Sequence, residues 1–153
     1  MATRYLPLIL AACLLSLPAC ETTSVAELGP DPAPLPADVR IVEPAADVPA
    51  EFAAFAGVWD GRWGYELDSA LAVQRVNAEG DVTAIYSWGD SAGNFDAGRV
   101  RRDGYIRDGT LHLDRFGNGA RARFELQDDG TLRGTYIRGA RVSKGTFRKR
   151  SEI

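Results

Sequence analysis

The sequence has 153 residues, with 18 Lys and Arg against 21 Asp and Glu and a formal net charge of −3. About 95 of these residues, from Gly57 onward, are enough for one compact core but not for two. Both cysteines lie within the first twenty residues and there is one histidine, which excludes an internal disulfide and a His/Cys zinc site in that domain. We expect no cofactor and no metal.

The N-terminus has the features of a short targeting segment. One basic residue, Arg4, precedes an apolar run from Leu6 to Leu17, which ends in Leu17-Pro18-Ala19-Cys20. The run is too short to cross a bilayer permanently, which takes about 20 residues. These features resemble a bacterial lipoprotein signal, in which cleavage frees a cysteine that then receives lipid. The resemblance implies a signal peptide over residues 1–19 and a membrane anchor on acylated Cys20.

Two alternatives to Cys20 stay open. Leu10-Ala11-Ala12-Cys13 matches the cleavage motif more closely in residue type, but it leaves a very short apolar core and an exposed apolar stretch behind it. The other alternative is an ordinary secretory signal with an unmodified thiol. Glu21 is not the aspartate associated with inner-membrane retention in enteric bacteria. We therefore expect the cell envelope, the outer membrane in preference to the inner, with the domain in the periplasm or at the cell surface.

A change in composition near residue 50 marks a domain boundary. All eight prolines lie between Pro7 and Pro49, and fifteen of the sixteen glycines lie from Gly57 onward. A segment rich in Pro, Ala and acidic residues cannot bury enough apolar surface to offset its ordering entropy. We expect a disordered tether over residues 20–50 and one β-barrel domain over residues 51–153.

The domain alternates with period two and breaks at Gly, Asp and Asn every 8 to 12 residues, a pattern typical of a sandwich or barrel. Short turns between consecutive strands imply an antiparallel meander, and about eight strands that close on themselves remove both sheet edges. We therefore predict an all-β fold, a single meander barrel. The predicted strands are Gly57–Leu67, Ala70–Asn77, Asp81–Trp88, Ala97–Arg102, Tyr105–Arg107, Thr110–Arg115, Ala120–Gln127, Thr131–Arg138 and Arg141–Lys149.

The first predicted strand opens with Phe55-Ala56-Gly57-Val58-Trp59 after a short helical turn. This resembles the Gly-x-Trp start of lipocalins and avidin-type barrels, the calycins, and Gly134-Thr135-Tyr136 is similar to an avidin strand. The resemblance implies a calycin-like barrel with Gly57 and Trp59 at a plugged end and Arg148 or Arg150 packed on Trp59. Arg148 is our choice. The lipocalin Thr-Asp-Tyr segment and C-terminal helix are absent, so the resemblance carries no ligand.

Few residues offer catalytic chemistry. The single histidine, His112, lies between Leu111 and Leu113, so alternation turns it away from the core. No serine sits in a Gly-x-Ser-x-Gly elbow, and no Gly-rich loop precedes a helix. We expect no catalytic residues and no enzymatic activity.

Aromatic residues gather on the predicted interior face, and Trp88 directly precedes the longest predicted loop, residues 89–94. An eight-stranded interior is just wide enough to be filled by side chains or to hold one small ligand. Core filling and an amphipathic pocket are both open, since Trp and Tyr combine apolar faces with polar tips. The candidate ligand-binding residues are Trp63, Tyr65, Tyr86, Trp88 and Tyr136.

Charge is unevenly distributed, because residues 99–150 carry fourteen bases and six acids. These bases either form a face for anionic ligands or pair with acids on neighbouring strands.

Our leading hypothesis is a membrane-anchored lipoprotein whose barrel binds a small apolar or anionic molecule. The alternative is an envelope assembly factor or inhibitor that acts through its basic strands or loops on a protein partner. Nucleic acid is excluded as a partner of an exported protein.

Overall fold

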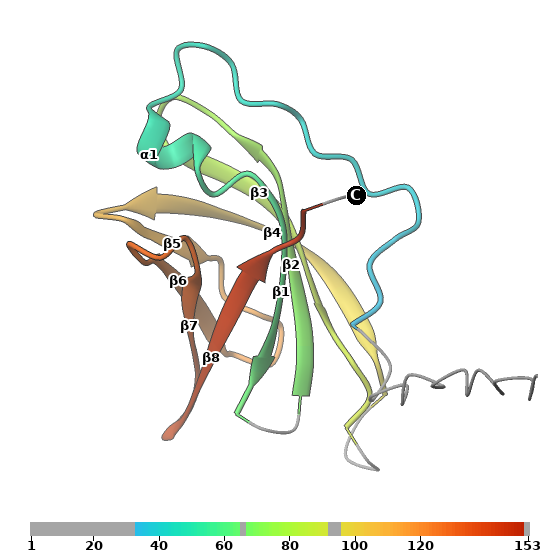
Figure 1. Ribbon diagram of the computed structural model, residues 1–153. Helices are drawn as coiled ribbons and strands as arrows, with labels where there is room; N and C mark the ends of the chain where they lie inside the picture. The colour runs from blue at the N-terminus through green and yellow to red at the C-terminus, as the bar shows by residue number, and fades with distance from the viewer. Residues whose placement is uncertain (1–32, 65–66, 92–95, 152–153) are drawn as a thin grey trace, which may run out of the picture.

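The computed structural model describes residues 33–64, 67–91 and 96–151, and it confirms the predicted fold. Eight antiparallel strands in chain order close into a barrel (Figure 1). Cys13, Cys20 and Tyr65 lie outside the described residues. The elements are α1 (Ala50–Ala53), β1 (Gly57–Trp63), β2 (Leu67–Val76), β3 (Asp81–Trp88), β4 (Gly98–Arg107), β5 (Thr110–Leu113), β6 (Arg121–Leu126), β7 (Leu132–Arg138) and β8 (Arg141–Lys149).

One predicted break is wrong. Asp103-Gly104 does not turn the chain, and β4 runs unbroken through it to Arg107, so the segment over residues 105–107 is no separate strand. Gly104 pairs with Val82 and Leu113 on the two flanking strands, and a Cβ there would collide with the carbonyl of His112. Glycine is needed here for close strand approach, whereas the turn that follows uses Asp108 and Gly109 at positive φ.

Alternate residues of the strands line the interior, as predicted, and Leu71, Val73 and Ile106 add to those expected from the sequence. They form one core together with Phe55 and Phe147, which are both fully buried. A register shift between Val73 and Arg75 keeps Val76 opposite Val82, so the end of β2 still contributes to this core. The barrel is therefore a packed structure along most of its length.

The barrel end under α1 is closed by Trp59. Its Nε1 donates a hydrogen bond of 2.8 Å to the Phe55 carbonyl. The Lys149 Nζ lies 5.1 Å from the Trp59 ring centroid and donates to the Ala54 carbonyl at 3.1 Å. Partial burial lowers the pKa of Lys149. The expected plug is therefore present, but with a lysine as its cation.

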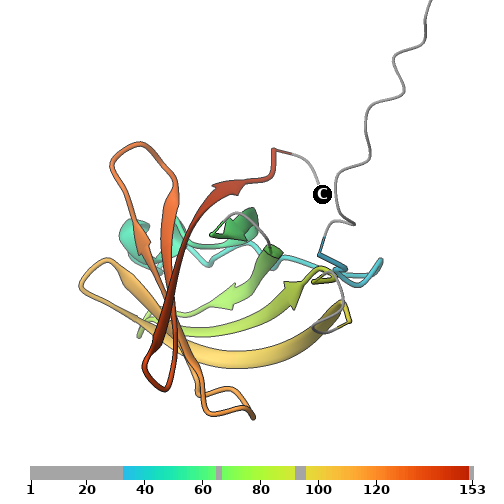
Figure 2. The ribbon, with the colours of Figure 1, turned by 90° about the horizontal axis from the view of Figure 1, so that it is seen from below.

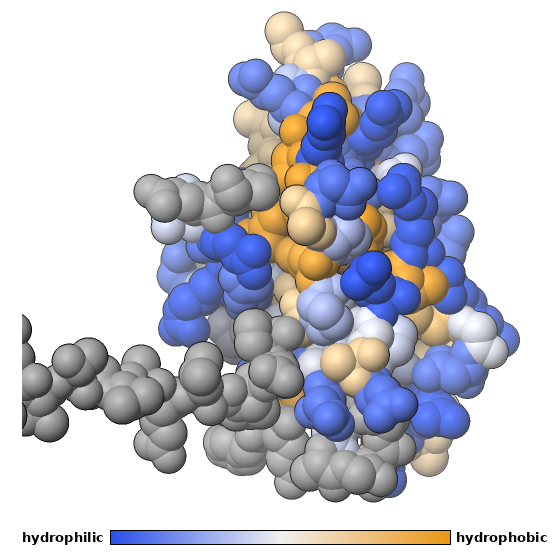
Figure 3. Space-filling view, turned by 90° about the vertical axis from the view of Figure 1, so that its right-hand side faces the viewer, coloured by the Kyte–Doolittle hydropathy of each residue, from blue (hydrophilic) through white to orange (hydrophobic). Residues whose placement is uncertain are grey.

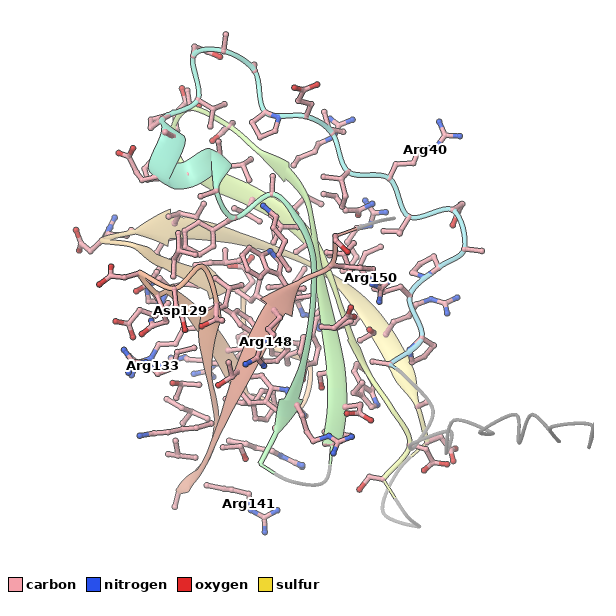
Figure 4. The ribbon with its side chains drawn as sticks, in the orientation of Figure 1. Arg40, Asp129, Arg133, Arg141, Arg148 and Arg150 are labelled. Carbon is pink, nitrogen blue, oxygen red and sulfur yellow. The ribbon has the colours of Figure 1, made fainter. Side chains whose placement is uncertain are left out.

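Lys149, and not Arg148, packs on Trp59, which corrects the sequence prediction. Phe147 points into the barrel, so period-two alternation turns Arg148 outward and Lys149 inward. Arg150 is also not at the plug, since its guanidinium binds the Asp60 carboxylate at 2.6 Å on the outer surface. Figure 4 labels both arginines on the β8 side of the barrel.

The structure describes residues 33–49 of the predicted tether, and apolar residues of this segment pack on the barrel. Leu35, Val39 and Ile41 cover a small apolar patch on the outer face of β1–β3, formed by Val58, Ala72 and Ile85. Figure 3 shows hydrophobic surface on this side of the molecule, bordered by hydrophilic side chains. We call residues 33–48 the strap.

Replacing Lys149 tests the plug. We expect Lys149→Met, which keeps the length of the side chain but removes the cation and the donor to Ala54, to lower the free energy of unfolding by about 1 kcal/mol. Arg148→Met is the matched control and should change stability by less than about 0.5 kcal/mol, because the side chain is exposed. Urea unfolding measures both, and a larger cost for Arg148→Met would contradict the assignment.

Candidate ligand-binding site at the barrel mouth

The barrel end opposite α1 is the candidate site, and we call it the mouth. Figure 2 shows the molecule from this end, with α1 at the far side of the ring of strands. Trp63 lies at the end of β1, Trp88 at the end of β3 and Tyr136 near the end of β7, so all three project there. The structure thus brings together four of the five predicted residues, including Tyr86, and Tyr65 lies outside the described residues.

Trp63 and Tyr86 belong to the filled core below the mouth. The Trp63 Nε1 donates a 2.7 Å hydrogen bond to the Tyr86 hydroxyl, and the two residues are 6% and 4% exposed. The Trp63 ring also lies 5.1 Å from Phe147, centroid to centroid. These two residues are therefore part of the packed core.

Trp88 and Tyr136 are only half-buried and form the layer nearest the opening of the barrel. The Trp88 ring lies 6.0 Å from Tyr86, and its Nε1 donates to the Asp96 carbonyl at 3.0 Å. Gly98 lies against Trp88, since a Cβ there would be 2.6 Å from the indole. The Tyr136 hydroxyl accepts a 3.0 Å hydrogen bond from the Asn118 amide. These two residues present aromatic surface at the mouth.

Two further residues of the mouth were not predicted. Phe116, from the β5–β6 loop, folds inward with its ring 5.2 Å from Tyr86 and 5.8 Å from Tyr136. Arg102 lies on β4 opposite Ala84, an interior residue, and its guanidinium stands 5.2 Å from the Phe116 ring centroid. Alternation within the predicted strand Ala97–Arg102 already places Arg102 on the side of Val100, whereas nothing in the sequence marked Phe116.

Arg102 has unused hydrogen-bonding capacity. Its Nη1 donates to the Arg101 carbonyl at 2.9 Å, but the Nε is buried and has no hydrogen-bond partner. Within the described ranges, Arg102 forms no ion pair. A buried donor without a partner is costly and calls for an explanation. The mouth thus contains a cation whose charge and one N–H are available to a ligand.

The hydroxyls of Tyr86 and Ser69, inside the barrel next to the mouth, are neutral. Burial raises the pKa of Tyr86 to about 12, opposed by the neighbouring Ser69 hydroxyl and by the hydrogen bond from Trp63. The Ser69 Oγ lies beside the phenol without a well-aligned hydrogen bond and counts as buried and unsatisfied. Arg102 therefore dominates the electrostatics of the described mouth.

His112 lies on the outside of the barrel, as alternation predicts. Its ring stacks on Tyr105 with centroids 4.9 Å apart, and burial, then Arg123 and Arg107, lowers its pKa. Across the described ranges there is no group of three or more His, Cys, Asp or Glu side chains that could hold a metal ion. The same ranges contain no helix that is long and apolar enough to span a membrane.

Comparisons with known proteins add little to this geometry. No protein-family model matches the sequence, and no curated protein matches it. Among solved structures, a variant of the fluorescent protein UnaG is similar, with a TM-score of 0.43 and 14% identity over 64% of this chain and 97% of that chain. At this level the likeness carries no inference about a ligand.

Replacing Tyr86 with phenylalanine tests the polar contact below the mouth. The variant removes the acceptor of a buried indole N–H, so we expect it to lose about 1–3 kcal/mol of unfolding free energy at pH 7. Burial disfavours the phenolate, so the folded pKa of about 12 exceeds the reference value of 10.0. The parent therefore keeps its full stability below pH 10 and loses stability as the pH rises toward 12. That decline amounts to about 2 kcal/mol and should be absent in Tyr86→Phe.

Urea unfolding at pH 7, 10 and 11.5 measures both effects. Tyr105→Phe is the matched control, since that ring is 44% exposed on the outer surface and the variant should keep the alkaline decline of the parent. Equal pH dependence in Tyr86→Phe and the parent would show that the phenol does not titrate as described.

Proposed function

We propose that this protein is a lipid-anchored binding protein of the cell envelope, and that its barrel mouth holds a small amphiphilic molecule with an anionic group. The observation that carries the proposal is the inward Arg102, which has a buried, unpartnered Nε and a guanidinium over the Phe116 ring. An arginine in such a place is stabilised by a carboxylate, sulfate or phosphate that accepts from its guanidinium.

The apolar part of the ligand has matching surfaces. Phe116 packs on Tyr86, Tyr136 and the Arg102 guanidinium, so its ring occupies the space closest to the cation. It belongs to a loop rather than to a strand, and this loop carries Gly117 and Gly119. Displacement of Phe116 by the apolar body of a ligand would leave that body between Trp88 and Tyr136. Pockets of this kind combine mostly apolar walls with few polar groups.

A binding role fits the mouth better than a catalytic one. Its described polar groups are one guanidinium, hydroxyls, an amide and indole N–H groups, and its phenol at Tyr86 stays neutral at physiological pH. General acid–base catalysis works best with a group that titrates near the working pH. The single histidine is on the outer surface, stacked on Tyr105.

The anchor is the second part of the proposal. Acylated Cys20 would hold the barrel near the membrane, because the chain from Cys20 to Ala33 spans at most about 45 Å when fully extended. A diacylated cysteine gives stable attachment where a single chain does not. The mouth would then meet amphiphiles that leave or enter that membrane.

Titration with dodecanoate below its micelle concentration tests the mouth, with tryptophan fluorescence as the readout. We expect the full chain to bind dodecanoate more tightly than dodecanol. Arg102→Met should raise the dodecanoate Kd by about 10- to 100-fold, the range for losing a charge-assisted contact, and leave dodecanol unchanged. Arg101→Met, on the outer face of the same strand, is the control. Equal loss in both variants, or no fluorescence response, would contradict the site.

The mass of the mature protein tests the anchor. We expect Cys20→Ser to remain unacylated and Cys13→Ser to be acylated like the parent. Loss of acylation in Cys13→Ser alone would move the anchor to Cys13. An unmodified thiol in the parent would instead indicate an ordinary secretory signal.

A further inference from the structure

The outer face of β6, β7 and β8 is strongly basic, and we call it the basic face. Strand alternation turns Arg121 and Arg123 of β6, Arg133 of β7 and Lys144 of β8 outward, and Arg138 and Arg141 flank the turn between β7 and β8. Figure 4 shows Arg133 and Arg141 pointing away from the barrel. The sequence left open whether these charges are paired.

Ion pairs neutralise only a small part of the positive charge on the basic face. Arg133 binds Glu125 at 3.1 Å, and this is the one ion pair that the described residues form on the basic face. The Asp129 carboxylate beyond it is held by Thr131, and these hydrogen bonds, with a smaller contribution from Arg148, lower its pKa. Most cations of the face are therefore exposed and available.

A shallow cleft of about 450 Å³ lies at one side of the basic face. Arg62, Arg133 and Lys144 line it from three neighbouring strands, together with Thr146. Arg62 and Arg133 each also hold a carboxylate, whereas Lys144 has no ion pair among the described residues. The cleft thus offers several N–H donors and a hydroxyl in a recess of headgroup size.

The basic face also carries exposed apolar surface at the mouth end. Val142 is 55% exposed and stands opposite Ile137 across the β7–β8 pair. The next pair toward the turn is Arg138 opposite Arg141. The hairpin tip that these four residues form lies at the mouth end of the barrel, which is the lower end in Figure 1. Cations around an apolar tip are suited to an interface that is charged outside and apolar beneath.

The opposite side of the barrel carries an acidic groove, as well as the outward Arg99, Arg101 and Arg107 of β4. Strands β2–β4 stand across the closed sheet from β6–β8. There a groove of about 760 Å³ between the strap and these strands is lined by Glu43, Asp47, Glu79, Asp81, Asp103 and Asp114, with Arg75 as its one cation. An anionic surface would attract the basic face and repel the acidic groove.

We propose that the basic face docks on an anionic lipid surface, with the β7–β8 tip at the bilayer interface. Charge complementarity favours any polyanion, but the exposed Val142 among arginines favours lipid, because a soluble polyanion has no apolar layer to accept it. Docking in this way places the mouth at the membrane. The proposal does not depend on a ligand in the mouth.

Sedimentation of the full chain with vesicles tests the docking. We expect binding to phosphatidylcholine vesicles that contain 30% phosphatidylglycerol, weaker binding to phosphatidylcholine alone, and loss of the difference in 0.5 M salt. The triple variant Arg138→Gln, Arg141→Gln, Lys144→Gln should bind the anionic vesicles at least about tenfold more weakly. The matched control, Arg99→Gln, Arg101→Gln, Arg107→Gln on β4, removes the same charge and should lose less than threefold.

A second variant separates lipid from other polyanions. Val142→Ser should weaken binding to the anionic vesicles severalfold and leave binding to soluble dextran sulfate unchanged. Equal losses in the two triple variants would overturn the assignment of the basic face. Unchanged vesicle binding in Val142→Ser, with tighter binding to dextran sulfate, would identify the partner as an acidic polymer. Loss of vesicle binding in Arg102→Met would transfer the lipid contact to the mouth.

Discussion

The hydrogen bond between Trp63 and Tyr86 determines where the filled interior ends and the mouth begins. It satisfies the polar tips of two large rings that would otherwise be costly to bury, while burial keeps the phenol neutral. Gly134 makes room for it, since a Cβ there would lie 2.6 Å from the Trp63 ring. On the α1 side of this contact, Phe124 and Phe147 fill the barrel. On its mouth side lie Trp88 and Phe116.

The acidic groove, the basic face and the mouth lie on different parts of the barrel surface. The acidic groove and the strap lie over β2–β4, and the basic face lies over β6–β8. The mouth opens at one end, between Arg102 inside the barrel and the cationic β7–β8 tip outside it. An amphiphile with an anionic group would meet cations first on the outer surface and then in the interior, without crossing the acidic side.

Period-two alternation with glycine-rich turns was enough to predict the barrel, its strand order and most inward residues, because each signal is local. The sequence predictions failed where the role of a residue depends on a neighbour that is distant in the sequence. Gly104 allows the close approach of β5, which is distant in the sequence, so its role cannot be read along the chain. The plug was missed by one residue, because the orientation of Phe147 decides between Arg148 and Lys149. The strap was read as a tether because its apolar residues are sparse, and only the patch on β1–β3 explains them.

The strap also changes how force from an anchor reaches the domain. Leu35, Val39 and Ile41 are pinned to the outer wall, and the Val42 N–H donates to the Gln74 carbonyl at 2.8 Å. A pull on the N-terminus is therefore resisted in shear along this wall before any strand of the barrel is loaded. The strap would therefore protect the strands of the barrel from a force applied at the N-terminus.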